Sequence, residues 1–155
     1  MGEGTDAAFY ESSNNGASAC VLRDHTRNFY EAQAAWHIQV LDACTMEAMA
    51  CRDGIKMAVQ AGFQRVHLET DCLDVVQLWK RRGTQRSIIA PVLEEIVELS
   101  QSLLDFSFSF VNRVCNKVAH VLAKQVSETH RLERWHVTPA CVVDLVFFEA
   151  SASWA

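Results

Sequence analysis

The hydrophobic period of the chain changes once, near residue 41, and this change limits the folds that the chain can adopt. Before it, apolar residues form three short runs, at residues 6–10, 17–23 and 29–37, and the segments between them are rich in turn-forming Ser, Asn, Gly and Asp. After it, Ala and Met side chains recur at helical spacing up to Gly62, which is suited to a helix C-cap. We therefore expect an antiparallel meander followed by a helix.

The rest of the chain alternates between the two periods. Strands are predicted at residues 65–70 and 106–110, the second from a strict alternation of Phe and Ser. Helices are predicted at residues 73–80, 88–104 and 116–129, the last with Asn116 as its N-cap. From Trp135 onward no period is clear. The order of elements predicts an α/β fold with a mixed sheet.

Length and composition favour one compact domain. The chain has 155 residues, of which 50% are hydrophobic and 21% are charged, so it is too apolar to be disordered throughout. We expect the domain to occupy residues 1–130 and a C-terminal tail to occupy residues 131–155, and the packing of this tail on the domain is left open. No segment resembles a linker between two domains.

The charge balance excludes a generally basic, histone-like binder of nucleic acid. The 14 basic and 19 acidic residues give a net charge of −5. The acidic excess lies in residues 1–79, whereas basic residues slightly outnumber acidic ones in residues 80–155. A nucleic-acid partner is therefore compatible with the sequence if it contacts the second half of the chain.

The cysteines and the first residues predict the compartment. The six cysteines are scattered without a CxxC pair, and because the chain begins with polar and acidic residues we expect no secretory leader. No apolar run approaches the about 20 residues that a membrane-spanning helix needs. We expect an intracellular protein of the nucleus or cytoplasm with reduced thiols. The set Cys44, Cys51, His67 and Cys72 fits no common zinc spacing, so free cysteines are expected there too.

Three acidic residues stand where acidic residues are costly. Asp6 lies inside the first predicted strand, Glu47 lies on the inward stripe of the first helix, and Asp71 directly follows the strand at residues 65–70. Buried carboxylates are usually paired, protonated or bound to a cation. Each has a structural alternative: Asp6 could brace a turn, Glu47 could pair with Arg113, and Asp71 could cap the next helix. Taken together, the three acidic residues lie in a strand, in a helix and at the end of a strand, in that order along the chain. This combination is more specific than any of the three alone.

Several blocks of the sequence resemble ribonuclease H type 1 domains, and most closely the plant reverse-transcriptase-like, retroelement-derived branch. The blocks are Asp-Ala-Ala-Phe at 6–9, residues 16–24, Glu-Ala-Met-Ala at 47–50 with Gly54, residues 66–72, and residues 110–124. The resemblance covers roughly residues 5–127. It implies a five-stranded mixed sheet, with three antiparallel strands followed by a parallel pairing, flanked by helices.

The resemblance also implies an activity. Relatives cut the RNA strand of RNA–DNA hybrids, with four acidic residues holding two Mg²⁺ (or Mn²⁺) ions. Asp6, Glu47 and Asp71 match the first three acidic positions. At the fourth, where many members have Asp, this chain has His120. Imidazole is a softer ligand than carboxylate and can carry protons near pH 7, so His120 is either a fourth metal ligand or a proton carrier. A catalytically weak or inactive module that binds nucleic acid or protein is the alternative.

A basic track is expected beside the acidic centre. Its candidate residues are Lys80, Arg81, Arg82, Arg86, Arg113, Lys117 and Lys124. Contacts of such residues with phosphates give affinity that depends on salt and not on base sequence. For residues 80–86 a solvated loop is an equal alternative. Because Asp6 lies so near Met1, we expect either a short first strand or a chain that is part of a larger protein.

Overall fold

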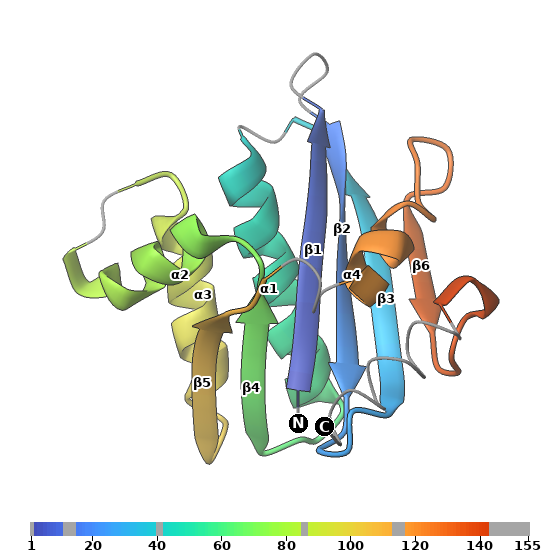
Figure 1. The fold of residues 1–155 in the computed structure, drawn as a ribbon. Helices are drawn as coiled ribbons and strands as arrows, with labels where there is room; N and C mark the ends of the chain where they lie inside the picture. Colours follow the sequence, from blue (N-terminus) through green and yellow to red (C-terminus); the bar gives the residue numbers. More distant parts are fainter. Residues whose placement is uncertain (1, 11–14, 40–41, 85–86, 113–116, 143–155) are drawn as a thin grey trace.

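The computed structural model describes residues 2–10, 15–39, 42–84, 87–112 and 117–142, with residues 2–10 described by their backbone. These residues form a six-stranded mixed sheet with helices on both faces (Figure 1). The strands are β1 (Gly2–Tyr10), β2 (Asn15–Arg23), β3 (Phe29–His37), β4 (Arg65–Thr70), β5 (Asp105–Phe110) and β6 (Leu132–Trp135). The helices are α1 (Ala43–Gln60), α2 (Leu73–Lys80), α3 (Ala90–Ser100) and α4 (Lys117–Ala123), with short 3-10 helices η1 (Arg82–Thr84) and η3 (Ala140–Val142).

The predicted fold class is confirmed. β1, β2 and β3 pair antiparallel, while β4 pairs parallel with both β1 and β5, in the spatial order β5-β4-β1-β2-β3-β6. The five expected strands are all present, and β1 begins at Gly2, so the first strand is not short. The structure adds a sixth strand, β6, which pairs antiparallel with β3.

Two helices are shorter than their apolar patterns predict. α3 ends at Ser100, where the hydroxyls of Ser100 and Ser102 donate hydrogen bonds to the carbonyls of Val97 and Leu99. Such side-chain bonds compete with the helical ladder. α4 ends at Ala123. The next two backbone N–H groups, of Lys124 and Gln125, donate hydrogen bonds to carbonyls three residues earlier, and not four as in an α-helix. The capping prediction for Asn116 lies outside the described residues.

The two faces of β2 explain how the helices attach. Ala17, Ala19 and Val21 pack against α4, while Cys20 and Leu22 pack against α1. Since successive strand residues point to opposite faces, the apolar residues of β2 contribute alternately to the core on each face of the sheet. The strand residues facing α4 are mostly alanines, and α4 itself places two further alanines against them. These small side chains let α4 lie close to the sheet.

The boundaries of α1 follow its sequence. The Asp42 carboxylate accepts a hydrogen bond from the backbone N–H of Thr45 at 2.7 Å, which satisfies one of the free donors of the first turn. At the other end Gly62 has a φ of +86°, a conformation that glycine adopts without strain. The predicted glycine cap is confirmed. In the described part of the chain no helix is both long enough and apolar enough to cross a membrane.

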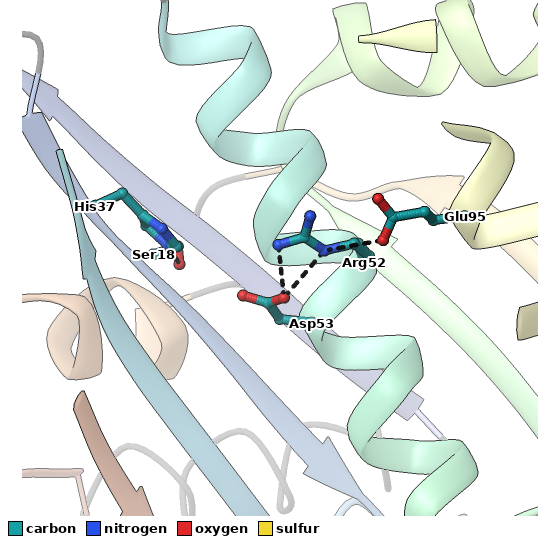
Figure 2. Close-up of polar contacts among 5 residues, drawn as sticks. All are labelled: Ser18, His37, Arg52, Asp53 and Glu95. Carbon is teal, nitrogen blue, oxygen red and sulfur yellow. Dashed lines mark hydrogen bonds and ion pairs between the residues drawn. The ribbon is translucent and has the colours of Figure 1, made fainter. Parts of the chain in front are cut away.

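Polar contacts join α1 to α3 and lie beside a partly buried pair on the sheet (Figure 2). Arg52 bonds the Asp53 carboxylate at 3.1 Å and approaches Glu95 of α3 at 3.7 Å. On the sheet, Ser18 Oγ and His37 Nε2 lie 2.8 Å apart, and Ser18 is 2% exposed. Burial lowers the pKa of His37; Asp53 opposes this shift and Arg52 adds to it.

We predict that acidification below about pH 6.5, the ordinary pKa of histidine, destabilises the fold through His37. Because its pKa is lowered in the folded state, the unfolded chain binds the proton first, so stability is present above this pH and falls as the pH decreases. Urea unfolding across this range should show a smaller pH dependence in His37→Gln. The exposed His25, changed to Gln, is the control; an equal effect in both variants would contradict the assignment.

Candidate functional site

Asp71 occupies the corner between β4 and α2. Asp71 is half-buried, and its carboxylate makes no hydrogen bond or ion pair with any other described residue. The corner is held by the Thr70 hydroxyl, which accepts a hydrogen bond from the N–H of Cys72. Cys72, and not Asp71, is the N-cap of α2, and no side chain caps that helix. The capping alternative for Asp71 is therefore wrong.

The register of the sheet brings the position of Asp6 beside that of Asp71. β1 and β4 are parallel neighbours, and Thr5 is paired with Thr70 at the end of their ladder. Asp6 is the next residue on β1, where it also pairs with Ala19 of β2. Asp71 is the next residue after β4. Since paired strands lie about 4.8 Å apart, the backbones of Asp6 and Asp71 are close neighbours.

Glu47 approaches this edge from α1. The helix packs against β1, β2 and β4 and runs antiparallel to β4, so its N-terminal turns lie at the end of the sheet where β4 finishes (Figure 1). Glu47 lies in the second turn and is 7% exposed, in agreement with its inward position in the sequence pattern. Its alternative partner Arg113 lies outside the described residues. A carboxylate is thus buried beside the edge that carries Asp71.

His120 comes from the opposite layer. It lies in α4, which contacts β1, β2 and β3 on the face opposite α1, and it is half-buried. Ala119 and Leu122, on either side of it in sequence, are fully buried against the sheet. The central strand β1 is therefore contacted by the helix of Glu47 on one face and the helix of His120 on the other.

These residues fit a hard divalent cation by their donor chemistry. Carboxylate oxygens are the ligands that Mg²⁺ and Mn²⁺ prefer, and the Asp71 carboxylate is not used for capping. Among the described side chains, which do not include that of Asp6, no three His, Cys, Asp or Glu residues are arranged to hold a metal ion.

The predicted basic residues behave differently from one another. Lys80 and Arg81 are exposed at the end of α2, and their side chains form no hydrogen bond or ion pair within the described segments. Arg82 is fixed: its guanidinium donates to the carbonyl of Trp79 at 2.9 Å and lies 4.1 Å from the centre of the Trp79 ring. Lys117 is exposed at the start of α4, and Lys124 is exposed just after its end. Arg86 and Arg113 lie outside the described residues.

Comparison with known proteins identifies the family. Residues 4–126 match the model of the family described as "Reverse transcriptase-like". The chain belongs to this family. No curated protein matches the chain significantly.

Solved structures give the same fold for this reverse transcriptase-like chain. Ribonuclease H1 from the halophilic archaeon Halobacterium salinarum NRC-1 is 20% identical, with a TM-score of 0.69 over 80% of this chain and 94% of that chain. The N-terminal ribonuclease H domain of rv2228c from Mycobacterium tuberculosis, fused to maltose-binding protein, is 14% identical, with a TM-score of 0.72 over 100% and 99%. LC11-RNase H1 in complex with an RNA/DNA hybrid is 13% identical, with a TM-score of 0.71 over 83% and 96%. At these identities the similarity establishes the ribonuclease H fold alone.

Sequence reasoning also missed that Cys44 and Cys72 affect each other's pKa. A hydrogen bond from the Cys44 thiol lowers the pKa of Cys72 to about 7, and the same contact raises the pKa of Cys44. Cys51 is fully buried in the hydrophobic cluster against which Cys44 and Cys72 pack, and His67 Nε2 and Ser109 Oγ are hydrogen-bonded at 2.9 Å. Cys44, Cys51 and Cys72 are free cysteines, as the sequence analysis expects. No spacing rule connects positions 44 and 72, because only the fold brings them together.

Proposed function

We propose that this domain is a metal-dependent endoribonuclease that hydrolyses the RNA strand of RNA–DNA hybrids. The observation that carries the proposal is the register between β1 and β4, which puts Asp6 next to Asp71 at the edge approached by the buried Glu47. A ribonuclease H relative of the same fold, LC11-RNase H1, is known in complex with an RNA/DNA hybrid. Family, fold and acidic edge together support this reaction.

In this proposal the residues have separate roles. Asp6, Glu47 and Asp71 would hold the divalent ions, Mg²⁺ or Mn²⁺ with two expected, and His120 would be a fourth ligand or a proton carrier. When bound, such ions activate water and stabilise the leaving oxygen of a phosphodiester. Lys80, Arg81 and Lys117 would hold phosphates of the hybrid by charge. Arg82 would stabilise the loop through Trp79 and keep other N–H groups for phosphate.

The direct test is cleavage of an end-labelled RNA–DNA hybrid with Mg²⁺ and with Mn²⁺. Cleavage within the RNA strand, absent with single-stranded RNA of the same sequence, supports the proposal.

A second function, a module that binds nucleic acid without turnover, is favoured by one observation: His120 lies at a position where relatives often carry Asp. Binding of the hybrid without cleavage by either ion would favour this second function.

The first prediction of this proposal concerns Asp71. Ions that bind only the folded state raise its stability, by about 2.7 kcal/mol at an ion concentration of about 100 times Kd. Asp71→Asn removes a ligand charge, so both the increase in Tm with Mn²⁺ and the cleavage should be lost. The control is Asp74→Asn, an exposed carboxylate in the first turn of α2. An unchanged increase in Tm with Mn²⁺ in Asp71→Asn would contradict the assignment of Asp71 as a metal ligand.

The second prediction concerns Lys80 and Arg81, the exposed cationic residues at the end of α2. Each phosphate contact removed should lower the slope of log affinity against log salt by about 1. The double variant Lys80→Ala/Arg81→Ala should therefore bind the hybrid more weakly at low salt and with a smaller slope. Lys56→Ala/Arg134→Ala removes two exposed charges elsewhere and serves as the control. Equal slopes for the wild type and the α2 variant would show that these residues form only a solvated loop.

The third prediction concerns the metal preference set by His120. Because imidazole is a softer ligand than carboxylate, we expect low activity with Mg²⁺ and higher activity with Mn²⁺. His120→Asp adds a hard, charged ligand and should raise the Mg²⁺ rate, whereas the uncharged His120→Asn should not. Melting curves establish that each variant is folded. If folded His120→Asp is inactive with both ions, catalysis is excluded at this site and the binding module is favoured.

A further inference from the structure

A small polar pocket lies between α1 and the strands β3 and β6. α1 packs mainly on β1, β2 and β4, so β3 and β6 extend beyond it and leave a recess of about 180 Å³ beside the helix. The residues that line the pocket are Gln33, Asp53, Lys56, Met57, Gln60 and Arg134. None of them is assigned to the metal or to the hybrid, so a ligand in this pocket is independent of the proposed function.

Regular structure fixes the two walls of the pocket. On α1, Asp53, Lys56 and Gln60 are spaced three and four residues apart, so they share one side of the helix. On the sheet, Gln33 of β3 is paired directly with Arg134 of β6, and paired side chains stand about 5 Å apart on the same face. Arg134 reaches this position because β6 extends the sheet beyond β3. Polar groups from the helix and from the sheet thus line the same recess.

Two cations of the pocket have no partner. Lys56 and Arg134 are exposed, and neither forms an ion pair or a side-chain hydrogen bond within the part of the chain that the structure describes. The lining carboxylate, that of Asp53, already accepts hydrogen bonds from Arg52 at 3.1 and 3.2 Å (Figure 2). The lining residues therefore offer an excess of positive charge, which an anion between the two walls would balance.

We propose that this pocket binds hydrogen phosphate or a small phosphate monoester that carries a hydroxyl group. The oxygens of a phosphate group point in four directions, so they can accept from Lys56 and Arg134 on the two walls at once. The two oxygens of a carboxylate lie in one plane and are less suited to such a bridge. The volume is below the about 300 Å³ at which pockets for drug-sized ligands begin, in agreement with a small ligand.

Asp53 gives the pocket a means of selection between anions. An ionised carboxylate accepts hydrogen bonds and donates none, so it needs a ligand that brings a hydrogen. Hydrogen phosphate has an O–H group near neutral pH, and a hydroxylated monoester has one on its organic part. Sulfate has the same shape as phosphate but no hydrogen at this pH. Beside Asp53 it would place one acceptor against another, which is unfavourable.

Binding is measured by isothermal titration calorimetry of the full chain near neutral pH, with phosphate, glycerol phosphate and sulfate at matched ionic strength. We expect phosphate to bind and sulfate to bind about tenfold more weakly or less. Additional binding of glycerol phosphate supports a monoester as the source, whereas binding of phosphate alone supports the free ion. No binding of either at about 10 mM, which detects a Kd of about 1 mM, would overturn the proposal. Equal affinities for phosphate and sulfate would overturn selection by Asp53.

Variants assign the binding to this pocket. Lys56→Gln and Arg134→Gln each remove a cation from one wall and should each weaken phosphate binding about tenfold, because a charge-assisted hydrogen bond is lost. Arg65→Gln removes an exposed cation from β4 and is the matched control. Asp53→Asn introduces an amide that can donate, so it should reduce the preference for phosphate over sulfate. Melting curves establish folding; if Asp53→Asn does not fold, the two cation variants decide. Unchanged affinity in both of them, or an equal loss in Arg65→Gln, would overturn the assignment.

Discussion

The parallel pairing of β1 with β4 is the constraint on which the site depends. Its ladder ends with Thr5 beside Thr70, and this register alone makes Asp6 and Asp71 neighbours. A shift of one residue would also place every side chain of β1 on the opposite face of the sheet. The register is held by the layers on either side, because α1 packs on one face of β1 and α4 on the other. The packing of these two layers thus determines the spacing of Asp6 and Asp71.

Much of this arrangement could be predicted from the sequence, since it follows from local periods. The alternation of Phe and Ser located β5, helical spacing with Gly62 located α1, and the strand at residues 65–70 was correct at both ends. β6 could not be found in this way: it has four residues, Leu132–Trp135, and becomes a strand by pairing with β3. The role of Arg82 was also hidden, because its contact with Trp79 depends on the turn after α2.

The acidic edge gathers negative charge that the proposed ions would neutralise. Glu47 is almost fully buried, and the neighbouring backbones of Asp6 and Asp71 bring two more acidic residues to the same edge. A divalent cation bound at this edge would neutralise their negative charge.

The most direct measurement of the central claim is a crystal structure of the reduced protein grown with Mn²⁺, with the ion located by its anomalous scattering. The account predicts a peak bound by carboxylate oxygens of Asp6 and Asp71, with Glu47 as a further ligand, and a weakened peak in Asp71→Asn. An ordered Asp6 and Asp71 with no peak between them, in a crystal that binds Mn²⁺ elsewhere, would contradict it.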